Sequence, residues 1–256
     1  HFILDEADRM LDMGFYDDIM KIANALPKDR QNLLFSATMP PKIRTLATSL
    51  LKNPKSISLA ISKPAEGLTQ NAYMIHDNQK VRLVRELLKA KGKDLSHVLI
   101  FASSIKSVKE IKTTLNKAGM RASEMHSGLD QDQREETIRD FKNKKIRILV
   151  ATDILSRGID IKGIELVINY EVPHDAEDYV HRIGRTARAD RTGEAITFIN
   201  PRQVKNFMDI EKLIEKAVPK LDLPNGFEKG PEYTIQQRNN KKKWNNNQRF
   251  NKKPNS

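Results

Sequence analysis

Cysteine is absent from this chain of 256 residues. Disulfide bonds and thiolate metal sites are therefore excluded, which is compatible with a reducing cytosol. Long apolar runs are absent too, because the longest, Val98 to Ala102, is far too short to span a bilayer. The chain begins with His1 rather than Met, and its first residues do not form a charged-then-apolar leader pattern. We therefore expect a soluble cytoplasmic protein without membrane contacts, whose sequence begins at a cut.

One glycine pattern is also missing. The phosphate-cradling sequence GxxxxGK[ST] does not occur: the only Gly-Lys pair, Gly92-Lys93, is followed by Asp94, and Leu87 stands where the first Gly would be. Backbone N–H groups of such a loop hold the phosphates of a nucleotide. A complete site of that kind is not expected from this chain alone.

The charge is strongly unbalanced. Lys and Arg outnumber Asp and Glu by 45 to 33, giving a net charge of +12, which indicates a polyanionic partner. Residues 233–256 hold seven of the basic side chains and no acidic one. This Asn- and Lys-rich segment cannot bury enough apolar surface to fold alone. We expect residues 221–256 to be a disordered basic tail.

Apolar strand patterns alternate with helical patterns over the rest of the chain. This alternation predicts an α/β fold with parallel sheets covered on both faces, and an active edge at the carboxyl ends of the strands. The expected strands are residues 1–6, 31–37, 55–61, 71–76, 97–102, 121–125, 146–151, 166–170 and 195–199. The expected helices are residues 16–25, 42–51, 80–90, 105–118, 131–143, 176–186 and 203–216.

Two apolar strands deliver acidic residues to their ends. Asp5 and Glu6 follow Phe2 to Leu4, and the segment DILSRGID, residues 153–160, follows the strand IRILVAT. An adjacent acid pair suits a Mg²⁺ ligand and a water-orienting group. The alternative is a strand-end pair that caps the following helix, as Asp5 and Asp8 could do.

A third feature is the segment YVHRIGRTARA, residues 179–189, in which arginines recur every third residue at 182, 185 and 188. In helical geometry Arg185 and Arg188 lie on neighbouring turns of one face. Composition alone favours a solvated basic helix. The alternative is a pair of guanidiniums directed at a phosphoryl group. Together with the two acidic strand ends, the pattern favours nucleoside triphosphate chemistry.

The chain resembles the DEAD-box RNA helicases over residues 1 to about 217. The resemblance rests on LDEAD (4–8), SAT (36–38), HSG with QxxR (126–134), ATDILSRGID (151–160) and HRIGRTAR (181–188), which occur in that order. Residue 187 is Ala where this family usually has Gly. The motif DEADRMLDMGF and the tail are most similar to the bacterial RhlE-type group.

The resemblance implies two RecA-like domains. Residues 1–61 would be the rear part of the first, ATP-binding domain, and residues 70–220 would be the complete second domain. Residues 62–69, SKPAEGLT, contain Pro and Gly without apolar periodicity, so we expect them to be the linker.

The resemblance also implies roles for individual residues. Asp5 would hold Mg²⁺ through water, Glu6 would orient or activate the attacking water, and Arg185 and Arg188 would be arginine fingers. Residues that would couple the ATP site to the opposite domain are Asp8, Ser36, Thr38 and His181. Gly158 and Asp160 would contact the nucleotide ribose. RNA would be contacted by Ser103, Gly128, Arg134 and Thr152, and Gln131 would brace Arg157.

The activity implied is ATP-dependent and Mg²⁺-dependent unwinding of short RNA duplexes, or remodelling of RNA–protein complexes, through closure of the two domains. Contacts to sugar and phosphate carry little sequence information, so the RNA would be bound largely without sequence preference. Ribosomal or RNA-decay proteins are possible partners. Without its phosphate-binding loop the chain is expected to be inactive alone. The alternatives are a non-catalytic RNA-binding or regulatory module and a DNA-acting relative in the same superfamily.

Overall fold

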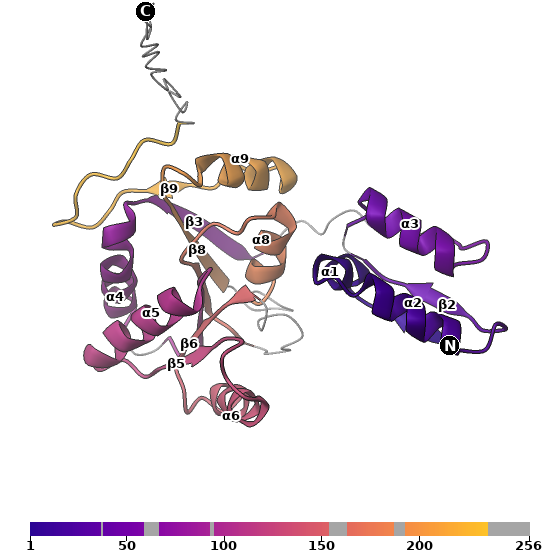
Figure 1. Ribbon diagram of the computed structural model, residues 1–256. Coiled ribbons are helices and arrows are strands. Elements are labelled where there is room, and N and C mark those ends of the chain that lie inside the picture. The colour runs from indigo at the N-terminus through magenta and orange to yellow at the C-terminus, as the bar shows by residue number, and fades with distance from the viewer. Residues whose placement is uncertain (37, 59–66, 93–94, 154–162, 187–192, 235–256) are drawn as a thin grey trace, which may run out of the picture.

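The computed structural model describes residues 1–36, 38–58, 67–92, 95–153, 163–186 and 193–234. Figure 1 shows them as a smaller body, formed by residues up to 58, and a larger body that begins at residue 67. Each body is built on a parallel sheet. Within the described residues no helix is both long and apolar enough to cross a membrane.

The smaller body pairs β1 (Phe2–Leu4) with β2 (Asn32–Leu34) and adds α1 (Ala7–Asp12), α2 (Tyr16–Ala25) and α3 (Pro41–Leu50). Pro41 occupies the first turn of α3, where its missing N–H costs nothing. The apolar side chains of the helices and of β1 meet in one core, formed by Leu4, Ala7, Ile19, Ala23, Ile43, Leu46 and Leu50.

The strand expected at residues 55–61 is wrong where the structure describes it, because residues 55–58 form no strand. Residues 59–61 lie outside the described part. Ile57 is 85% exposed, so its apolar side chain has no core to enter. A strand needs a neighbour for its backbone groups, and residues 55–58 have none among the described strands.

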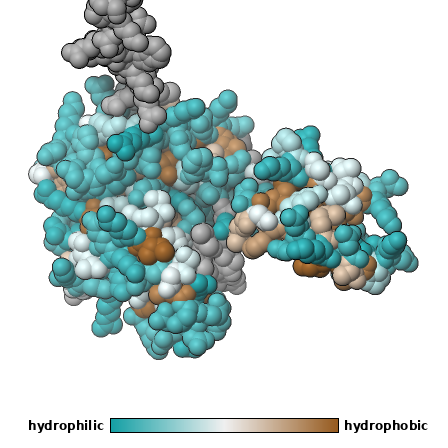
Figure 2. All heavy atoms as spheres, in the orientation of Figure 1, coloured by the Kyte–Doolittle hydropathy of each residue, from teal (hydrophilic) through white to brown (hydrophobic). Residues whose placement is uncertain are grey.

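The smaller body also leaves apolar side chains on its surface. Ile3 on β1 and Phe35 after β2 are 55% and 54% exposed, and Met13 and Phe15 are exposed between α1 and α2. Figure 2 shows brown and tan areas on that body.

The larger body contains a parallel sheet in the order β5-β6-β4-β7-β8-β3-β9. Its central strands are apolar on both faces, which is typical of a sheet covered on both sides. The strands are β3 (Leu68–Met74), β4 (Val98–Phe101), β5 (Ala122–Met125), β6 (Ile148–Ala151), β7 (Leu166–Asn169), β8 (Gly193–Ile199) and β9 (Lys220–Leu221).

Helices cover both faces of this sheet (Figure 1). One face packs against α4 (Lys80–Ala90) and α5 (Ile105–Lys117), and the 3₁₀ turn η1 (Asp77–Gln79) precedes α4. The other face packs against α6 (Gln131–Lys142), α8 (Ala176–Ile183) and α9 (Val204–Leu213). Side-chain caps fix two helix starts: Ser104 caps α5, and Asp130 with Gln133 forms a capping box on α6.

In the larger body, the sequence located each of the labelled α-helices and the strands β3 to β8, with end points shifted by up to three residues. The expected linker is too long, because β3 already begins at Leu68. The helix expected to reach residue 186 ends at Ile183, where Gly184 forms the C-cap. The strand β9 and, in the smaller body, the short helix α1 were not expected.

The expectation of a disordered tail from residue 221 is wrong for residues 221–234. Leu223 and Phe227 pack on the core beneath α4, and Arg82 lies 4.4 Å from the Phe227 ring centroid while it donates to Gly226 O at 3.0 Å. Residues 221–234 therefore form an ordered strap across the larger body. Residues 235–256 lie outside the described part.

Tyr233 fastens the end of this strap. Its hydroxyl donates to Glu211 Oε2 at 2.6 Å, and the Lys220 ammonium lies 4.0 Å from its ring centroid. Lys220 also pairs with Glu211. Gly230 has to be glycine, because a Cβ there would lie 2.0 Å from the Met74 carbonyl oxygen.

Candidate functional site

The acid pair lies at the end of β1, as expected. Asp5 and Glu6 are both exposed, and the Glu6 N–H donates to Asp5 Oδ1 at 2.9 Å. Glu6 has φ 50° and ψ 47°, a left-handed conformation that costs energy in any residue with a Cβ. Strained backbone of this kind concentrates at sites where a side chain has to be presented in one direction.

Asp8, Ser36 and Thr38 come together as one network between α1 and the segment after β2. Asp8 Oδ2 accepts from both the N–H and the hydroxyl of Thr38, each at 2.9 Å. The Ser36 hydroxyl accepts from the Asp8 N–H at 3.2 Å and donates to the Thr38 carbonyl at 2.7 Å. The expected coupling residues of the smaller body are therefore hydrogen-bonded to each other.

This network controls the charge of Asp8. Burial raises the pKa of its carboxyl, but the hydrogen bonds from Thr38, from the Arg9 N–H and from Ser36 outweigh burial and lower the pKa below its ordinary value. A carboxyl whose folded pKa is lowered stabilises the fold above its unfolded pKa. That contribution is lost as the pH falls through the folded value.

We expect Asp8→Asn to lower the free energy of unfolding of residues 1–58 by about 1 to 2 kcal/mol at neutral pH, because a charge-assisted acceptor at a part-buried position is lost. The free energy of unfolding of the Asp8→Asn variant should also depend less on pH in the acid range. Hydrogen exchange of α1 and β2 amides across pH values measures both effects. The exposed Asp29→Asn is the control, and equal acid dependence of the two variants would contradict the prediction.

In the larger body, the expected RNA contacts gather at one edge. Met125, Ala151 and Phe101 end β5, β6 and β4 in register with one another, so the residues after these three strand ends lie at the same edge. Thr152 comes one residue after β6, Ser103 two after β4, and Gly128 three after β5. Three strands that are adjacent in the sheet thus present the three residues together.

Hydrogen bonds hold this edge in shape. The Thr152 N–H donates to Met125 O at 3.1 Å, and the Gly128 N–H donates to His126 Nδ1 at 3.1 Å. Arg134, in the first turn of α6, donates to Ser127 O at 3.1 Å, which places its guanidinium against the loop of Gly128. All four expected RNA contacts therefore border the same surface.

Arg182 was expected on a basic helix face, but it is buried. Its side chain is 4% exposed and forms a two-pronged ion pair with Asp153, at 2.7 Å from Nε to Oδ1 and 2.6 Å from Nη2 to Oδ2. Spacing could not separate it from the other arginines, because its partner lies 29 residues away in sequence.

His181 lies in the last turn of α8, and Arg185 follows the end of that helix. The expected single helix face with Arg185 and Arg188 is therefore wrong at Arg185. Several predicted residues lie outside the described part: Arg157, Gly158, Asp160 and Arg188. Gln131, expected to brace Arg157, donates to Glu135 Oε1 at 2.8 Å.

Glu171 is a site residue that sequence reasoning missed. Its Oε2 accepts from the Ser103 N–H at 2.9 Å, so it holds one of the expected RNA contacts. Burial raises the pKa of its carboxyl, while Ser103, Lys80 and Arg182 oppose the rise. The sequence did contain a signal for Glu171, because it is an acid that directly follows the mostly apolar run LVINY (166–170) at the carboxyl end of β7.

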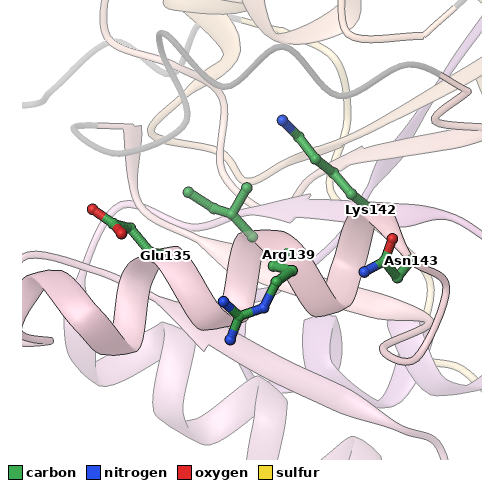
Figure 3. Close-up of a pocket in the computed structure, with 5 residues that line it drawn as sticks. Glu135, Arg139, Lys142 and Asn143 are labelled. Carbon is green, nitrogen blue, oxygen red and sulfur yellow. The ribbon is translucent and has the colours of Figure 1, made fainter.

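A hollow of about 260 Å³ lies along α6, lined by Glu135, Ile138, Arg139, Lys142 and Asn143. Figure 3 shows the four polar side chains projecting from that one helix and its end. None of the predicted site residues lines it. The candidate site is therefore not this hollow. It consists of the residues at the carboxyl ends of β1 and β2 in the smaller body and of β4, β5 and β6 in the larger body.

Comparison with known proteins gives two family matches. The DEAD/DEAH box helicase family matches residues 1–46, and the helicase conserved C-terminal domain matches residues 79–190. The DEAD-box ATP-dependent RNA helicase CshA of Geobacillus kaustophilus is 39% identical over 223 residues, which are 87% of this chain and 47% of that protein. A probable ATP-dependent RNA helicase of Methanocaldococcus jannaschii is 43% identical over 86% of this chain and 59% of its own length.

Among solved structures, S. cerevisiae Dbp5 bound to RNA and ADP BeF3 matches with a TM-score of 0.76 and 30% identity, covering 86% of this chain and 59% of that chain. The chain spans about half the length of the two curated relatives, CshA and the Methanocaldococcus protein. The RhlE-type assignment stays a prediction.

Proposed function

We propose, since the chain belongs to the DEAD-box helicase family, that it forms part of an ATP-dependent, RNA-stimulated helicase. The observation that carries the proposal is the edge formed by Ser103, Gly128 and Thr152, where three adjacent parallel strands end in register. Sheet edges of this kind are where α/β proteins bind ligands.

We call the surface formed by Ser103, Gly128, Arg134 and Thr152 the RNA edge. Its chemical groups suit binding of a sugar–phosphate backbone. Thr152 and Ser103 supply hydroxyls, Gly128 allows close backbone approach, and Arg134 supplies a permanent positive charge. Such groups bind phosphates and 2′-hydroxyls without reading bases. The Dbp5 structure, which holds RNA, supports this substrate class.

On the nucleotide side, Asp5 fits the demands of Mg²⁺. It is an exposed carboxylate at a strand end, and Mg²⁺ in phosphoryl-transfer sites is held through one or two carboxylates, waters and substrate phosphates. Mg²⁺ would neutralise charge on the phosphates. Glu6 would orient the attacking water, and Arg185 would stabilise charge that develops on the transferred group. Arg188, Gly158 and Asp160 complete the proposed nucleotide site.

Coupling between the two bodies is assigned to the Asp8, Ser36 and Thr38 network and to His181. The network is rigidly hydrogen-bonded, so a shift of the β2 end would be transmitted to α1. Closure of the two bodies on ATP and RNA would bend one strand and separate a short duplex. Ribosomal or RNA-decay proteins remain proposed partners.

The test needs a protein in which a segment with the GxxxxGK[ST] loop precedes residue 1, here called the loop-containing protein. We expect its ATP hydrolysis to be accelerated by single-stranded RNA and not by DNA of the same sequence. The 256-residue chain alone is the control, and we expect no hydrolysis from it because that loop is not in its sequence.

Two results would contradict the proposal. Equal acceleration by DNA would favour the DNA-acting alternative. RNA binding without any ATP hydrolysis by the loop-containing protein would favour a non-catalytic RNA-binding module.

A further inference from the structure

We propose that Arg182 is a positioning residue that fixes the RNA edge to helix α8, so that both move as one unit. This inference rests on the proposed function, in which the RNA edge binds RNA and the segment around His181 and Arg185 faces the nucleotide. It gives a role to a side chain to which the sequence analysis assigned none.

The guanidinium of Arg182 joins the ends of several strands. Nε and Nη2 bind the two carboxylate oxygens of Asp153, which lies just beyond β6. Nη1 donates to Asn169 Oδ1 at 3.2 Å and to Glu171 O at 3.0 Å, at the end of β7 and beyond it. The guanidinium carbon also lies 5.1 Å from the ring centroid of Phe101, the last residue of β4.

The partners of Arg182 lead within one step to expected RNA contacts. Asp153 is the next residue after Thr152. The carboxylate of Glu171 accepts from the Ser103 N–H at 2.9 Å. Arg182 therefore fixes the positions of Thr152 and Ser103 through Asp153 and Glu171.

On its other side, Arg182 belongs to the segment that carries the proposed nucleotide-facing residues. His181 precedes it directly in the last turn of α8. The Arg185 N–H donates to the Arg182 carbonyl at 3.2 Å. A displacement of His181 or Arg185 would therefore also displace Arg182, whose guanidinium is hydrogen-bonded to residues next to the RNA edge.

A buried ion pair could serve stability alone, and the geometry argues for more. Stability needs one partner, whereas the planar fork of Arg182 binds a carboxylate, an amide oxygen and a backbone carbonyl on two strand ends. Lysine has the charge but not the fork, so it cannot hold these acceptors at once. Arg182→Lys therefore tests positioning while it keeps the charge.

A matched control exists at the opposite edge of the same sheet. Arg147 precedes β6 and donates to the carbonyl oxygens of Leu95, at 2.6 Å, and of Gly92. It is also a part-buried arginine with backbone acceptors, but neither acceptor belongs to the proposed site. Arg147→Lys should therefore affect stability without affecting coupling.

The first experiment measures the loop-containing protein. We expect Arg182→Lys to lower RNA-stimulated ATP turnover by about 10²-fold, because misplacing a reacting geometry by about 1 Å has an effect of that size. Nucleotide affinity without RNA should change little, and Arg147→Lys should keep its RNA stimulation. Asp153→Asn should reproduce the effect, and the double variant should be no worse than the worse single variant.

The second experiment needs no activity. Amide hydrogen exchange on the 256-residue chain should show faster exchange at Ser103 and Thr152 in Arg182→Lys than in Arg147→Lys. Unchanged exchange at both amides would overturn the inference. If Arg182→Lys does not fold, Asp153→Asn decides by the same comparison, and failure of RNA to stimulate the unsubstituted protein counts against the proposed function instead.

Discussion

In the loop-containing protein, we expect Arg185→Ala to lower ATP turnover by about 10³ to 10⁵-fold, the size typical of an arginine finger. Arg185 follows the end of α8, where a permanently charged guanidinium would face charge that develops on the transferred phosphoryl group. RNA binding without nucleotide should change little, because the RNA edge is formed by other residues. Steady-state ATP hydrolysis at saturating RNA measures the effect.

The control for Arg185→Ala is Arg139→Ala, which removes an exposed arginine from α6 in the same body. It should leave turnover near that of the unsubstituted protein. A loss smaller than about tenfold, or 1.4 kcal/mol of barrier, for Arg185→Ala would remove the arginine from the proposed chemistry.

The second large effect is expected for Glu6→Gln. Glutamine keeps the size of the side chain, but it cannot take a proton from the attacking water. General base catalysis contributes about 10² to 10⁴-fold, so single-turnover hydrolysis with saturating ATP and RNA should fall by that factor. Nucleotide affinity should stay within about tenfold, because the carboxylate acts in the transition state.

Asp12→Asn is the matched control, since Asp12 is an exposed acid at the end of α1. A Glu6→Gln variant that hydrolyses ATP at the rate of this control would show that another group orients the water. Glu6 would then be a strand-end acid at the N-cap of α1 without a role in the chemistry.

Local patterns predicted the elements of the fold well. The helices Tyr16–Ala25 and Lys80–Ala90 were located without error, because their apolar residues recur at helical spacing and the segments before them interrupt it. Motif order also located the acid pair and the residues of the Asp8 network, and the RNA-binding role of Ser103, Gly128, Arg134 and Thr152 stays a prediction. The network forms because its members flank two adjacent parallel strands, whose carboxyl ends must meet.

Non-local contacts were beyond sequence reasoning. Residues 221–234 are polar and lack periodicity, yet they are ordered because a few side chains, such as Phe227 and Tyr233, enter cores built by distant residues. Conversely, residues 55–58 have a strand-like sequence and form no strand, since no described neighbour pairs with them. Composition measures what a segment could bury, whereas its order depends on the surface that it meets.

The sequence by itself determined that this chain is an α/β protein with acids and hydroxyls at strand ends, because those features follow from residue type and spacing. The order of its motifs indicated the DEAD-box family. Only the tertiary structure decided that Arg182 is a buried, ion-paired side chain while Arg185 lies past the end of α8. Both arginines follow the same three-residue spacing. Their difference arises because Gly184 ends α8 between them and because Asp153, just beyond β6, pairs with the first.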